Sequence, residues 1–185
     1  QSKSISLFYF FFGLLIFSML FLFNQSNVSN IVFEITKIHI SENIYTVGFI
    51  FSSLCTLFLI ILNYQILKKQ LPHQLALLVV MLLVFFTYEL LPAFAIYFVF
   101  FHSIPSIIEQ SDYLFGDSTK TENFKKFLLK GAVYWLLAIV FLVVMYLILK
   151  NNIDFSLAIF FSFLAAITFP HVLVIYKMKS EIHSK

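Results

Sequence analysis

Long runs of hydrophobic positions, separated by short polar segments, dominate the chain. The runs cover 5–23, 45–67, 74–101, 127–149 and 153–177. About 20 consecutive apolar residues are enough to cross a bilayer as a helix. The pattern therefore predicts an all-α fold, a polytopic transmembrane helical bundle that forms a single membrane domain over residues 1–185.

The run 74–101 is too long for one simple span, and Glu89-Leu90-Leu91-Pro92 interrupts it. A residue that precedes proline is biased away from the helical region, so we expect a tight turn there. The segment 108–126 is predicted to be a long loop, and 31–39 a short surface helix. About six transmembrane helices are then expected, at 5–23, 45–67, 74–88, 91–108, 127–149 and 153–177.

Charge provides an independent test of the six crossings. The twelve basic residues are all lysines. Six crossings leave only Lys37 and Lys150 on one side of the membrane and place the others on the opposite side: Lys3, Lys68, Lys69, Lys120, Lys125, Lys126, Lys130, Lys177, Lys179 and Lys185. Positive charge collects on the cytoplasmic side. We therefore expect a multi-pass protein of the inner (cytoplasmic) membrane with its C-terminus and lysine-rich loops in the cytoplasm.

Composition adds two constraints on the class of protein and on its partners. Hydrophobic residues make up 61% of the chain, above the 45–50% or so of soluble domains, which makes the lipid bilayer a partner. Arginine is absent, so the chain lacks the side chain best suited to bidentate binding of phosphate. The net charge of +3 is accounted for by topology, and we expect no nucleic-acid partner.

Two histidines fall within predicted helices. His102 lies six residues before the expected cytoplasmic end of the fourth helix, and His171 six before that of the sixth. At 1.5 Å of rise per residue, both are expected about 9 Å inside that face. Each also has a proline nearby, Pro105 and Pro170.

Imidazoles that converge at one level from different helices are an arrangement that binds metal in helical bundles. His102 and His171 are therefore candidate metal ligands and candidate catalytic residues. The alternative is that each imidazole hydrogen-bonds a neighbouring helix. Two imidazoles are an incomplete metal site, and spacing supplies no third.

Aromatic side chains near these positions are candidates to bind an apolar substrate: Tyr97, Phe101, Tyr134 and Trp135. Anchoring at the membrane interface and ordinary packing are alternative roles. The sequence contains no Ser-His-Asp set, HExxH motif, CxxC motif or pair of intramembrane carboxylates. A hydrolase or a proton-coupled transporter would need charges that these helices lack, whereas an apolar substrate would not.

Three segments of the chain have a recognisable pattern. The first runs from Ala93 through Tyr97 to His102-Ser103, the second is Gly131-Ala-Val-Tyr-Trp135, and the third is Thr168-Phe-Pro-His171 with the apolar residues that follow. Together they resemble the Brp/Blh family of bacterial and archaeal membrane β-carotene 15,15′-dioxygenases. The segment from Gly13 to Phe23, with Ile31-Val-Phe33, is also similar to a family segment. The resemblance spans most of the chain.

The resemblance implies a specific function. Family members are thought to hold a non-haem Fe(II) with histidines from several helices and to cleave the central double bond of β-carotene with O₂, giving two molecules of retinal. His102 matches the histidine of the family's His-Ser pair, and His171 matches the Pro-His segment, as a direct ligand or as a supporting group. Supply of retinal to a rhodopsin is a further implied role.

The sequence departs from the family pattern at two places. The position four residues after His102, where the family has a second histidine, is Ser106. The family's upstream HGxxD and HFG segments are absent, so we expect the C-terminal part of a longer enzyme, one that as given holds iron poorly. The alternative function is a non-catalytic membrane protein, either a carotenoid-binding relative or a structural subunit.

Overall fold

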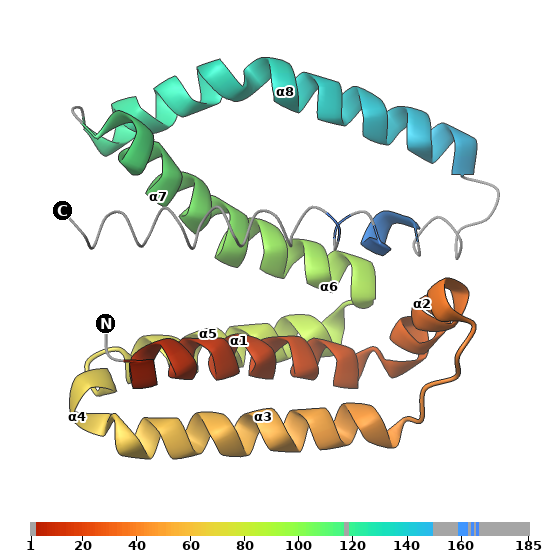
Figure 1. The fold of residues 1–185 in the computed structure, drawn as a ribbon, viewed down its shortest axis with the longest axis vertical. Coiled ribbons are helices and arrows are strands. Elements are labelled where there is room, and N and C mark those ends of the chain that lie inside the picture. Colours follow the sequence, from red (N-terminus) through yellow and green to blue (C-terminus); the bar gives the residue numbers. More distant parts are fainter. Residues whose placement is uncertain (1–2, 117–118, 150–158, 163, 165, 167–185) are drawn as a thin grey trace. The chain divides into compact units, whose positions relative to one another are not determined.

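The computed structural model describes residues 3–116, 119–149, 159–162, 164 and 166, and all the elements of that part of the chain are helical (Figure 1). The predicted all-α class is confirmed. In chain order the elements are α1 (Lys3–Phe23), α2 (Gln25–Thr36), α3 (Asn43–Leu62), α4 (Tyr64–Leu67), α5 (Leu71–Thr87), α6 (Leu90–Ile96), the π-helix η1 (Tyr97–Ser103), α7 (Ile104–Phe115) and α8 (Lys120–Leu149).

The chain divides into two compact units. The first comprises Gln1–Val28 and Ile40–Trp135, and the second comprises Ser29–His39 and Leu136–Lys185. The first unit therefore contains α1, α3 to α7 and the beginning of α8, together with His102. The predicted sixth helix, 153–177, lies largely outside the described residues.

Helix α1 is the centre of the first unit, and α3, α5 and α6 pack against it (Figure 1). Its sequence is almost continuously apolar, which suits a helix that has neighbours on more than one side. Phe8 and Leu20 of α1 are almost completely buried, as are Met81 and Phe85 of α5 and Ala93 of α6. The core of this unit is therefore built around α1.

Polar side chains connect α1 to α3. The hydroxyls of Ser18 and Ser52 are hydrogen-bonded to each other at 2.8 Å, and Ser52 is fully buried. Nearer the start of α1, Asn63 Nδ2 donates to Ser4 Oγ at 2.7 Å. Small side chains let helices approach closely in a bilayer, and their hydrogen bonds add to the packing. The pair α1–α3 is thus fixed by two polar links as well as by apolar contact.

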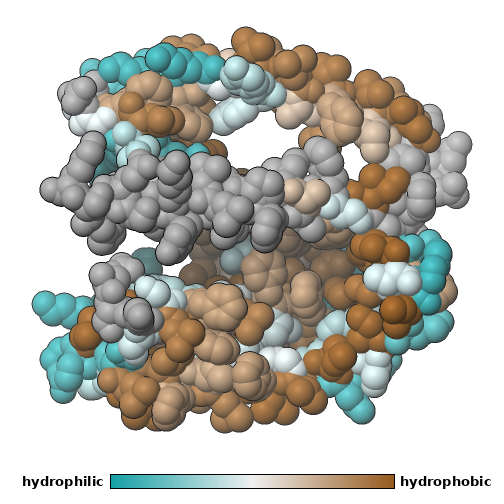
Figure 2. All heavy atoms as spheres, viewed as in Figure 1, coloured by the Kyte–Doolittle hydropathy of each residue, from teal (hydrophilic) through white to brown (hydrophobic). Residues whose placement is uncertain are grey.

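The outer surfaces of the helices are apolar. Leu54, Phe58 and Ile61 of α3 are each more than half exposed. Figure 2 shows hydrophobic side chains along α1 and α3 and hydrophilic ones gathered at the two ends of this helix pair. Soluble proteins rarely expose apolar surface on this scale, whereas a bilayer covers it.

Among the described residues, four helical stretches are long and apolar enough to cross a membrane. They are Ser4–Phe23, Asn43–Leu62, Leu90–Phe115 and Lys120–Ile148. Helix α5 is shorter, at 17 residues, which is about the lower limit for a span. The chain leaves helical geometry between α5 and α6, where Tyr88 and Glu89 have extended backbones, beside the turn that the sequence predicts.

The segment after His102 differs from the predicted loop 108–126. The helix continues through α7 to Phe115, and α8 begins at Lys120. Ser111 Oγ donates to Ile108 O within α7, and Asn123 Nδ2 of α8 donates to Asp112 Oδ1 of α7. Polar residues of this segment therefore form hydrogen bonds inside and between helices, and they do not end α7.

A capping pattern at the start of α8 went unnoticed in the sequence. Thr119-Lys-Thr-Glu122 has the spacing of a capping box, in which a threonine hydroxyl accepts from a backbone N–H three residues later. In the structure Glu122 N donates to Thr119 Oγ1 at 3.4 Å. The signal explains why α8 begins earlier than the predicted 127.

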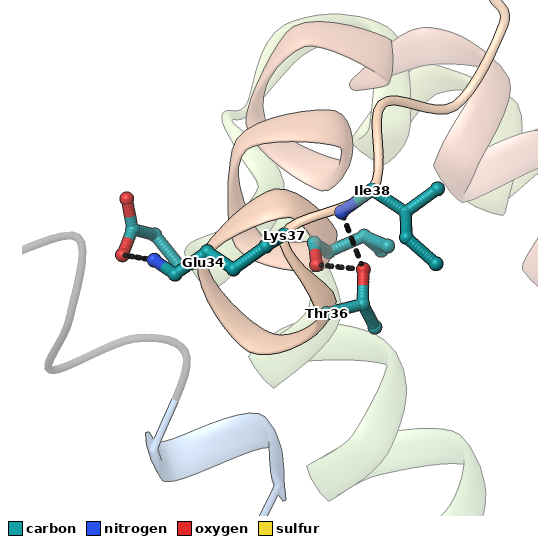
Figure 3. Close-up of polar contacts among 5 residues, drawn as sticks. Glu34, Thr36, Lys37 and Ile38 are labelled. Atoms are coloured by element: carbon teal, nitrogen blue, oxygen red, sulfur yellow. Dashed lines mark hydrogen bonds and ion pairs between the residues drawn. The ribbon is translucent and has the colours of Figure 1, made fainter.

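In the second unit, side chains stabilise the C-terminal end of α2 (Figure 3). Lys37 has a positive φ of 57°, the left-handed conformation common just after a helix. Its Nζ forms an ion pair with Glu34 Oε2 at 3.1 Å, while Thr36 Oγ1 accepts from Ile38 N at 3.2 Å. The chain is thus turned out of α2, and the observed α2 begins earlier than the predicted surface helix 31–39.

The buried Ser52 provides a test of the α1–α3 packing. Ser52→Leu forces a larger side chain into a fully buried position and removes the bond to Ser18, so we expect a loss of about 1–3 kcal/mol of stability. Thermal unfolding of the purified protein in detergent measures it. Ser6→Leu, the same change at an exposed position of α1, is the control and should change the transition little. Equal effects of both would show that Ser52 does not hold the two helices together.

Candidate active site around His102

His102 lies in the middle of a continuous helical segment. The stretch Leu90–Phe115 has 26 residues, and His102 is twelve residues after its start and thirteen before its end. At 1.5 Å per residue the imidazole is attached about 20 Å from the C-terminal end of the helix. The helix continues seven residues past the predicted end at Ile108, so its end does not mark the membrane face, and the depth of about 9 Å stays a prediction.

The helix changes its winding at the histidine. Residues Tyr97–Ser103 form the π-helix η1 between α6 and α7, with hydrogen bonds that reach five residues back instead of four. At its end Ile104 N donates to Val99 O. Pro105 follows as the second residue of α7. π-Helical turns are rare and often occur at functional sites.

Aromatic rings form a column along this segment. Phe94 and Phe98 are stacked, with centroids 5.5 Å apart and planes at 20°. Phe98 and His102 follow at 5.2 Å and 30°. The base of the column is fixed, because Phe94 is buried in the first unit. The imidazole therefore lies against an aromatic ring that is itself stacked on a core residue.

Tyr97 connects the start of η1 to α1. Its ring meets the ring of Phe17 edge to face, with centroids 5.3 Å apart and planes at 77°. Such pairs contribute about 0.5–1.5 kcal/mol beyond their buried area. Tyr97 is one of the four predicted substrate-binding residues, and its ring packs against Phe17.

The other predicted substrate-binding residues have exposed side chains. Phe101 of η1 is 39% exposed, Trp135 of α8 is 43% exposed and Tyr134 is 74% exposed. A Cβ atom added at Gly131 would lie 3.5 Å from Trp135 Nε1, so the indole lies over the backbone of its own helix. The side chains of these three residues therefore lie on the surfaces of apolar helices.

The predicted pairing of His102 with His171 is untested, since His171 lies outside the described residues. Within the described part of the chain, no group of three or more His, Cys, Asp or Glu side chains could hold a metal ion. These residues supply one imidazole of the predicted set, and they do not form an iron site by themselves.

Ser106, at the position where the resemblance led us to expect a second histidine, is hydrogen-bonded within α7. Gln110 Nε2 donates to Ser106 Oγ at 2.8 Å. Ser106 and Gln110 are four residues apart and so lie on one face of the helix. Neither this pair nor the contact of Phe98 with His102 was anticipated from the sequence, although both have the i, i+4 spacing that could have revealed them.

Comparison with known families decides the membership of the chain. A family described as beta-carotene 15,15′-dioxygenase matches residues 2–179. The chain belongs to this family. The match includes His102, Ser106 and His171, so the resemblance of the short segments extends over almost the whole sequence. Curated proteins and solved structures gave no match.

Membership in the beta-carotene 15,15′-dioxygenase family implies a function related to β-carotene cleavage and a carotenoid substrate. An apolar substrate is consistent with the apolar outer surfaces of the described helices.

The edge-to-face pair of Phe17 and Tyr97 can be measured with a double-mutant cycle. Phe17→Leu, Tyr97→Leu and the double variant should show a coupling of about 0.5–1.5 kcal/mol in unfolding experiments in detergent, because each single change removes the same ring pair. Phe10→Leu, on the same helix, is the matched control, since its ring packs on the neighbouring Phe11. Additive effects of Phe17→Leu and Tyr97→Leu would contradict a specific link between α1 and η1.

Proposed function

We propose that the protein is a membrane carotenoid oxygenase that cleaves the central double bond of β-carotene with O₂. One C=C bond breaks, and each of the two new carbonyl groups takes one oxygen atom, giving two molecules of retinal. The family match over residues 2–179 is the observation that carries this proposal. The position of an imidazole in the middle of a long apolar helix supports it.

The proposed cofactor is non-haem Fe(II), with His102 and His171 among its ligands. Imidazole nitrogens suit Fe(II), and iron would supply the oxygen chemistry that no side chain provides. Of the two proposed histidine ligands, only His102 lies among the described residues, which hold no group of three or more possible metal ligands. What the described helices do for the proposed site is to position this imidazole. The remaining ligands would come from His171 and from other family histidine segments.

The proposed path of the substrate is lateral, from the bilayer. A C40 hydrocarbon partitions into lipid, and it can reach the protein between helices without passing through water. Tyr97, Phe101, Tyr134 and Trp135 remain the proposed contacts. Phe101 and its neighbours Val99 and Phe100 are exposed on η1 itself, so apolar surface is available directly beside His102.

The hydrogen bond between Gln110 and Ser106 favours a second candidate function. A serine that accepts from its own helix replaces a histidine, and the loss of an imidazole would weaken a metal site. The alternative is therefore a relative that binds a carotenoid without cleaving it, or a structural subunit.

We further propose that the protein resides in the inner (cytoplasmic) membrane and that its retinal supplies a rhodopsin. The exposed Lys68 and Lys69 follow α4 at one end of the first unit, and positive charge favours the cytoplasmic side.

The oxygenase proposal predicts retinal formation. The complete gene, expressed in bacteria that produce β-carotene, should bleach the cells and yield retinal on extraction. His102→Ala should lower retinal by more than about 100-fold, because changing even the supporting partners of metal ligands costs 10–100-fold. His73→Ala, at an exposed position of α5, should leave the yield unchanged.

Three results would decide among the alternatives. Retinal at the normal level from a folded His102→Ala protein would remove the ligand role. Retention of coloured carotenoid without retinal by the wild-type protein would favour the non-catalytic candidate. Loss of the protein from the membrane in His102→Ala would indicate misfolding, and membrane extraction with immunodetection checks this.

The orientation predicts the labelling of single cysteines. In a Cys55→Ala background, Ser41→Cys should react with a membrane-impermeant maleimide in intact cells, since the segment between α2 and α3 is expected outside. Lys69→Cys should react only after permeabilisation. The reverse pattern would place the lysine-rich turn outside and refute the proposed topology.

A further inference from the structure

The π-helical winding at His102 has an identifiable cause in Pro105. In a regular α-helix the ring of a proline clashes with the carbonyl of the residue four positions earlier, and the proline donates no hydrogen bond to that carbonyl. For Pro105 that residue is Phe101, in η1. A wider winding moves the Phe101 carbonyl away from the ring, so the chain can stay helical through the proline.

The other described prolines support this explanation. Pro72 is the second residue of α5, and Pro92 is the third residue of α6. The first residues of a helix have N–H groups without intrahelical acceptors, so proline costs little there. The residues around Pro72 and Pro92 form regular α-helices. Pro105 differs because helical residues precede it without a break.

The winding also determines what His102 contacts. Four residues of an α-helix turn through about 400°, so residues four apart are offset by about 40° around the axis. A π-helix has more residues in each turn, so residues four apart fall short of a full turn and are offset in the opposite sense. The winding therefore sets the angle between Phe98 and His102, whose ring centroids are 5.2 Å apart.

The lower end of this column cannot follow a change in winding. Ala93 and Phe94 are buried, and Tyr97 is held by Phe17 of α1. A change in winding after Tyr97 therefore rotates His102 and α7 relative to a fixed base. The direction in which the imidazole leaves the helix thus depends on η1.

We propose that Pro105 is a positioning residue: it imposes the π-helical winding of Tyr97–Ser103, which sets the angle at which the imidazole of His102 lies over the ring of Phe98. The significance of this placement for cleavage rests on the proposed oxygenase function, whereas the placement itself does not.

The first measurement tests the winding without reference to activity. Spin labels are attached at Leu14→Cys on α1 and Leu114→Cys on α7 in a Cys55→Ala protein, and their distance is measured by pulsed electron resonance in lipid nanodiscs. Pro105→Ala should restore α-helical winding and rotate α7 by about 100°, the angular step of one residue. The expected change in distance is on the order of 5 Å. Pro92→Ala is the matched control and should leave the distance unchanged.

The second measurement reports on the imidazole. The ring protons of His102, observed in protein with ¹³C-labelled histidine and assigned by their loss in His102→Gln, should carry a ring-current shift from Phe98. Phe98→Leu should abolish the shift, and Pro105→Ala should change it, because the angular offset between residues 98 and 102 reverses its sense. Pro92→Ala should leave them in place.

Retinal formation is measured on the same variants. With an active wild-type protein, Pro105→Ala and Phe98→Leu should lower kcat at least 10-fold with little change in KM, while Pro92→Ala retains the wild-type values. An unchanged spin-label distance or unchanged His102 signals in a folded Pro105→Ala protein would overturn the proposal. So would full activity in a variant whose imidazole has moved. A wild-type protein that forms no retinal would refute the proposed function, and the two spectroscopic measurements would still decide whether Pro105 places His102.

Discussion

The packing of α1 against α3, α5 and α6 is the interaction on which the first unit depends. Within a bilayer, apolar contact between helices gains little from the hydrophobic effect, because lipid tails are as apolar as the side chains they replace. Close fit and hydrogen bonds must then supply specificity. Buried Phe8 and Leu20 provide the fit, and the bond between Ser18 and Ser52 fixes the register of α1 on α3.

The packing around α1 extends to the candidate site through the ring of Phe17. Phe17 lies on α1, and its edge-to-face contact with Tyr97 meets the helix at the first residue of η1. The part of that helix before Tyr97 is fixed to the core, and the part that carries His102 and Pro105 follows it. A change of winding placed at this junction aims the histidine relative to a rigid base. The contact of Phe17 with Tyr97 thus connects the core of the unit to the helix that carries His102.

The fold class could be predicted because long apolar runs are a strong signal in the sequence and do not depend on a periodic pattern. Runs of apolar residues near 20 in length indicate transmembrane helices by composition alone, and the all-α class was confirmed. Helix ends were predicted less well. Ser111 and Asp112 are common in turns, yet their hydrogen bonds to Ile108 and Asn123 keep them in α7. Whether a polar side chain ends a helix or bonds within it depends on partners that local composition does not specify.

For the candidate site, the sequence indicated one residue and not its surroundings. His102 stood out because an imidazole in an apolar helix has a cost, and it lies within the family match over residues 2–179. Its surroundings were not predicted, because a proline inside a helical pattern ordinarily suggests a kink or an end. Here the chain keeps its backbone hydrogen bonds by reaching five residues back, from Ile104 to Val99. Backbone groups in lipid must find partners within the protein, so a wider helix that retains them costs less than a break. The bilayer thus favours a local change of winding at Pro105, and that change determines where the imidazole of His102 points.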